Sequence, residues 1–99
     1  MAYTQTQLTL LKVDLGLMRP TEDQLTYLGH LLNAARQRIT KEGIALTDGN
    51  ADHDALVVMY AAWMYRKRAQ QPDQQAMPRM LRYQLNCELA NQHTQEAAP

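Results

Sequence analysis

The sequence predicts an all-α fold, a small bundle of about four helices arranged around a third helix that is apolar almost throughout. Three observations lead to this prediction. The 99 residues include four Gly and four Pro, whereas the abundant Leu, Ala, Gln, Arg and Met favour helices. Apolar residues recur at spacings of three and four, which is the period of one helix face. Residues typical of helix starts and ends flank each of these stretches.

The length corresponds to one domain. We expect a helical domain at residues 1–91 and a polar, disordered tail at residues 92–99, because the tail contains no large apolar residue. Ten Lys and Arg balance ten Asp and Glu, so the positive excess of a dedicated nucleic-acid binder is absent. The longest apolar run, residues 55–65, is about half of the roughly 20 residues that a membrane span needs. No membrane association is expected.

The first two helices are bounded by residues that favour helix starts and ends. A first helix is expected at residues 4–15, where Gly16 can adopt the left-handed conformation that ends a helix. A second helix is expected at residues 21–42. It opens with Thr21 and, three residues later, Gln24, the pattern of a capping box. Its apolar stripe, expected in the core, comprises Leu25, Leu28, Leu32, Ala35 and Ile39.

A third helix is expected from about residue 52 to residue 68, with acids in its first turn and basic residues in its last turn, as the helix dipole favours. A Gln-rich connection at residues 69–76 precedes a fourth helix, which we expect to end at about Asn91. Trp63 is expected to be largely buried between the second and third helices. The expected core residues of the third and fourth helices are Leu56, Met59, Tyr60, Trp63, Leu81 and Leu85.

The residue types needed for catalysis are missing or badly placed. The sequence has no Ser, and its one cysteine, Cys87, does not share a helix face with a histidine. The segment beginning at Asp48 starts like a calcium loop, but His53 stands where the sharp turn needs Gly. His53 and Asp54 also resemble a metal-binding pair, yet the further ligands are lacking, so we expect a surface pair in the first helical turn. We therefore expect no enzyme, no metal and no cofactor.

Local positive charge is the feature that rises above this background. Between residues 66 and 82 one acid, Asp73, stands against five basic residues, which we call the basic strip: Arg66, Lys67, Arg68, Arg79 and Arg82. The strip is either a solvated helix end or a surface that contacts phosphates or an acidic partner. A short connection containing Pro could bring its two parts to one edge of the protein.

Residues 52–68, the polar connection and residues 77–86 together resemble the head-tail connector (adaptor, or head-completion) proteins of long-tailed bacteriophages. In that family an acidic helix start leads into an Ala- and Tyr-rich helix with a basic end, and a helix rich in Arg and Leu follows. The first half agrees more loosely, with a short Leu-rich helix that contains Leu11, Lys12 and Leu15.

The resemblance implies a structural subunit that forms a ring of about a dozen copies beneath the portal after DNA packaging. The implied partners are the portal protein ring, a tail-completion or stopper protein, other copies of the chain, and genomic DNA bound without sequence specificity. The implied location is the head-tail interface of the virion, with assembly in the host cytoplasm.

Two alternatives from other classes remain open. A small helical DNA-binding regulator would use a helix, a turn and a second helix, but its reading positions would have to come from the apolar residues 55–65. A small hydrolase would need a second cluster of metal ligands, which the sequence does not provide.

Overall fold

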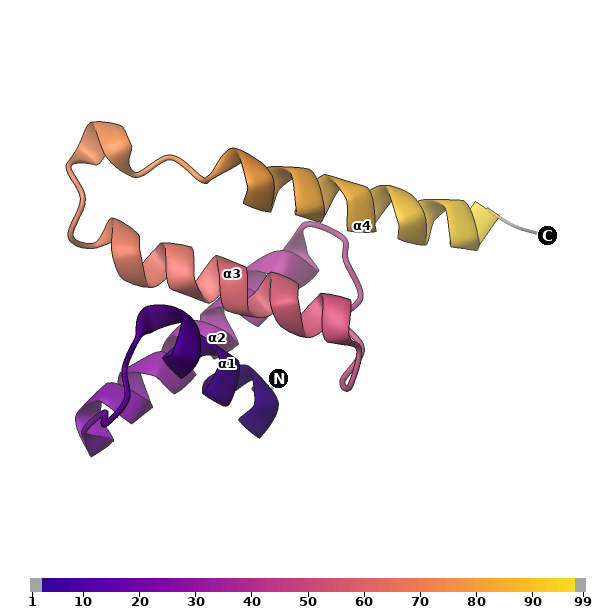
Figure 1. The fold of residues 1–99 in the computed structure, drawn as a ribbon. Coiled ribbons are helices and arrows are strands. Elements are labelled where there is room, and N and C mark those ends of the chain that lie inside the picture. The colour runs from indigo at the N-terminus through magenta and orange to yellow at the C-terminus, as the bar shows by residue number, and fades with distance from the viewer. Residues whose placement is uncertain (1–2, 98–99) are drawn as a thin grey trace.

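The computed structural model describes residues 3–97 and confirms the all-α fold, because the described residues form helices and no strand. Figure 1 shows their arrangement. α3 lies between α1 on one side and α4 on the other, and α2 crosses behind it. The helices are α1 (Gln5–Leu15), α2 (Glu22–Lys41), α3 (Ala51–Lys67), the short 3-10 helix η1 (Pro72–Gln74) and α4 (Arg79–Ala97).

Residues at the helix ends stabilise α1 and α2, as the sequence predicts for Gly16 and for Thr21 with Gln24. Thr4 and Gln7 form a capping box at the start of α1, and Gly16 ends this helix with a φ of 73°. Thr21 and Gln24 form the second capping box, in which each side chain accepts a hydrogen bond from the other residue's backbone N–H. Each box satisfies two amide donors that a helix start otherwise leaves without partners.

α3 is the central helix, since it packs against α1, α2 and α4. The side chain of Asn50 accepts hydrogen bonds from the backbone N–H groups of Asp52 and His53 and so fixes the start of α3. The middle of the helix is buried on most sides, as its nearly continuous apolar sequence predicts. Its buried residues are His53, Asp54, Leu56, Val57, Val58, Tyr60, Ala61 and Ala62.

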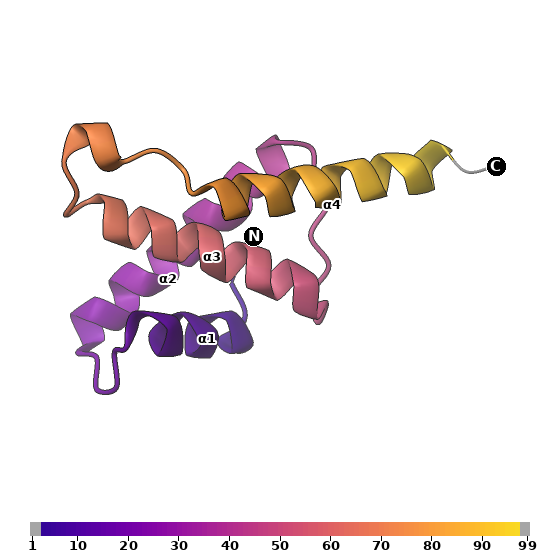
Figure 2. The same cartoon turned by 45° about the horizontal axis from the view of Figure 1, so that its top comes forward.

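α4 is attached to the rest of the protein along one narrow side. Leu81 and Leu85 are buried and Leu89 is half-buried, whereas most other described side chains of the helix are exposed. Figure 2 shows that the C-terminal part of α4 extends past the end of α3. The sequence predicts an end at about Asn91, but the helix continues and reaches Ala97. Residues 98–99 of the expected tail lie outside the described residues.

The eleven expected core residues all lie in one hydrophobic cluster or pack against it, although they are buried to different degrees. Eight of them are buried: Leu28, Leu32, Ala35, Ile39, Leu56, Tyr60, Leu81 and Leu85. Leu25, Met59 and Trp63 are partly buried and pack against these.

Trp63 lies on a different side of α3 from the one that the sequence predicts. Its ring meets Tyr60 edge-on, with centroids 5.4 Å apart, and it lines a small depression together with Asp14 of α1 and Leu81 of α4. The reason is helical geometry, because a spacing of seven residues places Trp63 on the same side as Leu56. Leu56 in turn borders Gln84 of α4. This side of α3 faces α4 rather than α2.

Candidate interaction surface

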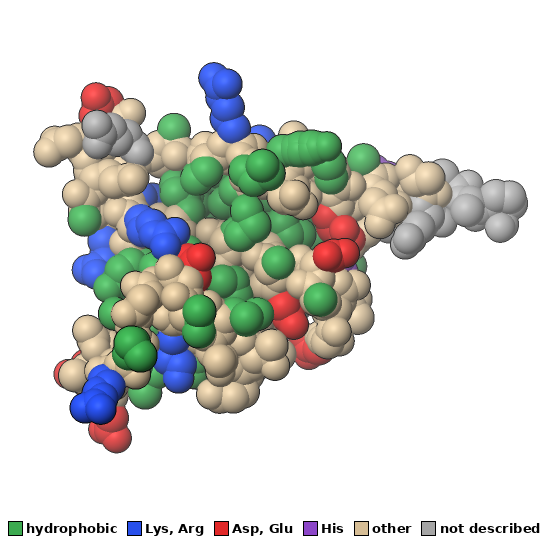
Figure 3. Space-filling view, viewed as in Figure 1, with side chains coloured by type: hydrophobic (Ala, Val, Ile, Leu, Met, Phe, Trp, Pro, Cys, Tyr) green, Lys and Arg blue, Asp and Glu red, His purple; other side chains and the backbone are tan. Residues whose placement is uncertain are grey.

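The two parts of the basic strip come from the end of α3 and from the start of α4, which lies over the middle of α3 (Figure 1). Arg66 lines a depression of about 200 Å³ together with Pro78 and Met80 at the start of α4. Figure 3 shows that the Lys and Arg side chains of the face in view lie in its left half, where acidic side chains also lie, whereas the right half shows acidic side chains and no Lys or Arg.

Two cations of the strip are held by carboxylates from distant parts of the chain. The Nη2 atom of Arg66 lies 3.0 Å from Oδ2 of Asp14 and also donates to the Asp14 carbonyl. The Nη1 atom of Arg82 lies 2.6 Å from Oε1 of Glu42. The hydrogen bond with Glu42 raises the pKa of Arg82 above its ordinary value. The strip therefore carries less uncompensated charge than its sequence indicates.

Aromatic rings contact two other cations of the strip. The Nζ atom of Lys67 lies 4.6 Å from the ring centroid of Trp63. The guanidinium of Arg68 lies 4.2 Å from the ring of Tyr65 and 5.6 Å from that of Tyr27. These are cation–π distances, and such contacts hold a positive charge in place without neutralising it. Lys67 and Arg68 therefore still present positive charge to the solvent.

Arg79 is exposed, and no carboxylate contacts it in the described part of the chain. It lines a groove of about 610 Å³ along the outer side of α4 with Arg82, Tyr83 and Cys87, among others. Beside the groove, Met80 is 62% exposed and Tyr83 is 55% exposed. A hydrogen bond with Cys87 raises the pKa of the Tyr83 phenol. The outer side of α4 thus combines apolar side chains with a free positive charge.

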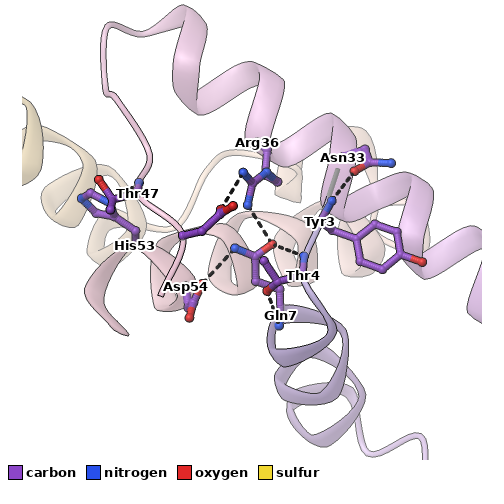
Figure 4. Close-up of polar contacts among 9 residues, drawn as sticks. Tyr3, Thr4, Gln7, Asn33, Arg36, Thr47, His53 and Asp54 are labelled. Carbon is purple, nitrogen blue, oxygen red and sulfur yellow. Dashed lines mark hydrogen bonds and ion pairs between the residues drawn. The ribbon is translucent and has the colours of Figure 1, made fainter. Parts of the chain in front are cut away.

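A buried polar network lies at the other end of α3. The side-chain amide of Gln7 donates to Asp54 over 2.9 Å, and Nη1 of Arg36 donates to the Gln7 oxygen over 3.2 Å. Arg36 also pairs with Asp48 at 3.1 Å. Figure 4 shows that these side chains come from α1, α2, α3 and the connection before α3 and converge on one point. The network joins the first three helices through polar contacts.

His53 is also buried, and it contacts α4. Its Nδ1 atom accepts a hydrogen bond from the backbone N–H of Thr47, so the hydrogen of the neutral ring sits on Nε2. Nε2 lies 2.9 Å from Oε1 of Glu88, which also accepts a hydrogen bond from Gln92. The expectation of a surface pair at His53 and Asp54 is therefore wrong, since the two residues are only 5% and 8% exposed. Their spacing to the buried Val57 could have indicated this.

A polar groove of about 480 Å³ opens beside His53 between the start of α3 and the C-terminal half of α4. Asp52 on its rim is exposed, and no cation contacts it within the described residues. Three more acids lie close by: Asp48 pairs with Arg36, Asp54 accepts a hydrogen bond from Gln7, and Glu88 meets His53. We call this region the acidic groove. Its lining residues are Ala45, Thr47, Asn50, Asp52, His53, Glu88, Asn91 and Gln92.

In the part of the chain that the structure describes, no three His, Cys, Asp or Glu side chains are grouped so that they could hold a metal ion. None of the described helices combines the length and the hydropathy that a membrane span requires. Comparison with protein-family models, with curated protein sequences and with solved structures finds no match.

Proposed function

We propose that this chain is a structural subunit of a bacteriophage head-tail connector. In this role it assembles as a ring beneath the portal after DNA packaging, extends the DNA channel and offers a docking surface for the tail. The observation that carries the proposal is the unpartnered outer side of α4, on which Met80 and Tyr83 are exposed beside Arg79. The resemblance of residues 52–68 and 77–86 to connector proteins supports the same function.

Exposed apolar side chains next to a free charge are typical of a protein–protein interface. α4 is stabilised mainly by Leu81 and Leu85 on its inner side, so its outer side is free to bind a second protein without loss of the monomer's core. The partners we propose are the portal ring, a tail-completion or stopper protein, and neighbouring copies in a ring of about a dozen subunits.

Contact with genomic DNA in the channel would depend on the few cations of the basic strip that no carboxylate holds within the described residues. These are Lys67, Arg68 and Arg79. So small a number of phosphate contacts makes binding weak, strongly dependent on salt and indifferent to sequence. This is what a DNA channel needs, because the DNA must slide through it.

The alternative function is a small helical DNA-binding regulator. In a helix-turn-helix unit the second helix places exposed residues in the major groove. α3 follows α2, yet its middle residues are buried from Leu56 to Val58 and from Tyr60 to Ala62, which leaves few positions to read bases. A regulator would bind one sequence far more tightly than others at a stated salt concentration, whereas a connector would not.

The test is to inactivate the gene in the phage or prophage that carries it. We expect DNA-filled heads and free tails to accumulate, and purified protein added to those heads should restore tail attachment. The variant Arg79→Glu should restore it poorly, whereas Arg19→Glu, an exposed charge in the α1–α2 connection, should act like the unaltered protein. Normal tail attachment in the absence of the protein would refute the proposed function.

A further inference from the structure

Two tyrosines and an arginine from different helices meet near the C-terminal end of α3. The rings of Tyr27 on α2 and Tyr65 on α3 have centroids 6.3 Å apart and are tilted by 53°. The guanidinium of Arg68 lies 4.2 Å from the ring of Tyr65 and 5.6 Å from that of Tyr27. These three side chains line a depression of about 280 Å³, which we call the tyrosine depression. Its other lining residues are Leu17, Asp23, Gln24 and Leu28.

From this arrangement we infer that the tyrosine depression binds one nucleotide of an unpaired DNA strand. The base stacks on the ring of Tyr27, and the phosphate pairs with Arg68. The site itself does not depend on the proposed connector function. Only its use on DNA in the channel rests on that function.

Tyr27 offers the stacking surface. It is 41% exposed, although its ring lies beside Tyr65 and Arg68. Every base has a flat face, so stacking on an aromatic ring binds unpaired strands of many sequences. In a duplex the bases stack on one another, and a base must leave the stack before a protein can reach its face. The site therefore distinguishes an unpaired strand from duplex DNA.

Arg68 supplies the positive charge for the phosphate. It is exposed, and no carboxylate contacts it in the described part of the chain. Its Nε atom donates to the carbonyl of Tyr65 over 3.0 Å, and its guanidinium lies on the ring of the same residue. These contacts position the side chain before a ligand arrives and leave its charge intact. A guanidinium has several N–H donors, so the remaining ones can donate to a phosphate.

Charge and shape together favour a nucleotide over other ligands. Aromatic side chains around a depression can bind a cation, but Arg68 already lies on both rings and would repel a second positive charge. An acidic peptide would satisfy Arg68, yet a carboxylate side chain has no flat ring to stack on Tyr27. A nucleotide carries both an anionic phosphate and a flat base, so it matches both groups.

Asp23 lines the same depression and limits which bases fit. It is an exposed residue of the first turn of α2. Its carboxylate repels a phosphate, so the phosphate must lie on the side of Arg68. A carboxylate also accepts a hydrogen bond from N4 of cytosine, whereas thymine has an oxygen at the corresponding position. We therefore expect a modest preference for cytosine over thymine.

The experiment measures binding of the full chain to fluorescein-labelled oligonucleotides of about ten nucleotides. Fluorescence anisotropy at one stated, low salt concentration gives the dissociation constants. The probes are a single strand of mixed sequence, the duplex of that strand, oligo-dC and oligo-dT. An unlabelled oligoglutamate of the same length serves as a competitor.

The variants separate stacking from charge. Tyr27→Leu removes the ring, whereas Tyr27→Phe keeps it. Tyr83→Leu is the matched control, because Tyr83 is an exposed tyrosine on α4. Arg68→Gln removes the charge, and Arg38→Gln, which alters an exposed arginine of α2, is its control. Circular dichroism checks that each variant is folded.

We expect the unaltered chain to bind the single strand at least about fivefold more tightly than the duplex, which corresponds to one stacked base. Oligo-dC should bind more tightly than oligo-dT. Tyr27→Leu should lose the preference for the single strand, and Tyr27→Phe should keep it. Arg68→Gln should weaken binding of every probe and reduce its dependence on salt. Both control variants should bind like the unaltered chain.

Equal affinity for the single strand and the duplex would overturn the inference. Tyr27→Phe binding as weakly as Tyr27→Leu would also overturn it, as would tighter binding of oligo-dT than of oligo-dC. Displacement of the oligonucleotide by oligoglutamate at equal concentration would assign the depression to an acidic peptide instead. The proposed function fails separately. If the chain prefers unpaired strands through Tyr27 but does not restore tail attachment, the nucleotide site stands and the connector function is wrong.

Discussion

The side-chain amide of Gln7 donates a hydrogen bond of 2.9 Å to the carboxylate of Asp54, which links α1 to α3 inside the protein. The oxygen of the same amide accepts from Arg36 of α2. One buried side chain therefore connects three helices, and a polar contact of this kind fixes their relative positions more narrowly than apolar packing does.

Replacing Gln7 by Ala should destabilise the protein by about 2 kcal/mol, because buried polar groups of Asp54 and Arg36 then lose a partner. Denaturant unfolding measures this change. Gln37→Ala is the control, since Gln37 is exposed on α2, and it should alter stability by less than about 0.5 kcal/mol. Equal losses in the two variants would mean that the network contributes nothing to stability.

Trp63 supports a second prediction. Its ring packs against Tyr60 and the apolar core, so Trp63→Ala should cost about 3 kcal/mol, the lower end of the range for buried aromatic residues. The indole Nε1 is buried and has no hydrogen-bond acceptor within the described residues. Trp63→Phe removes this unsatisfied donor along with part of the ring, and should cost about 1 kcal/mol or less.

Thermal unfolding of both Trp63 variants, followed by circular dichroism, separates these contributions. A Phe variant that is as unstable as the Ala variant would show that the indole N–H has a partner in solution. An Ala variant as stable as the unaltered protein would show that the side of α3 facing α4 adds nothing to the core.

Local sequence signals were sufficient to predict the helices but not the contacts between distant residues. The starts of α1 and α2 follow from side chains three residues apart, and Gly16 ends α1 through its own backbone preference. These interactions depend on neighbours in the sequence. The end of α4 was predicted too early, because Gln92 bonds to Ala45, a residue 47 positions away.

The charge of the candidate interaction surface could not be predicted for the same reason, because it depends on contacts between residues far apart in the sequence. The basic strip is visible in the sequence as a local excess of Lys and Arg, but its partial neutralisation is not. Asp14 and Glu42, which hold Arg66 and Arg82, lie 52 and 40 positions away. The burial of His53 likewise depends on Glu88, which is 35 positions away. Only the folded chain brings these pairs together.

The pairing of Arg82 with Glu42 leads to a third prediction, which contrasts two cations one turn apart on α4. Arg82→Glu places a carboxylate opposite Glu42, so like charges should loosen the start of α4. Arg79→Glu faces no acid in the described part of the chain and should leave the start of α4 as stable as before. Because both partners of the pair are partly exposed, we expect the loss in Arg82→Glu to be about 1 kcal/mol.

Hydrogen exchange along α4 tests this contrast. The backbone amides near Leu85 should exchange faster in Arg82→Glu than in Arg79→Glu, and adding Glu42→Arg to the first variant should restore protection. Equal exchange in the two single variants would show that the ion pair does not hold α4 in solution.

The contact between Tyr83 and Cys87 gives a prediction about pH. The hydrogen bond with Cys87 raises the pKa of the Tyr83 phenol above its ordinary value of about 10. A raised pKa means that the folded protein keeps this proton to a higher pH than the unfolded chain does.

Cys87→Ala should therefore lower the pKa of Tyr83. The measurement is the ultraviolet absorbance of ionised tyrosine between about pH 9 and pH 12, compared with Asn86→Ala, an exposed neighbour. An unchanged titration would mean that the thiol does not contact the phenol.

Gln92 provides the last prediction, because it holds the C-terminal half of α4 against the connection between α2 and α3. Its side-chain oxygen accepts from the backbone N–H of Ala45, and its nitrogen donates to the carbonyl of Ala45, each over 2.8 Å. The nitrogen also donates to Glu88.

Each such bond contributes about 1 kcal/mol, and apolar side chains anchor little of the helix beyond Leu89. Gln92→Ala should therefore speed hydrogen exchange in α4 from about residue 88 onward while the amides of α3 keep their protection. Gln84→Ala, at an exposed position on the same helix, should leave hydrogen exchange unchanged in both α4 and α3. If Gln92→Ala instead lowers protection throughout the protein, the end of α4 unfolds together with the core rather than separately.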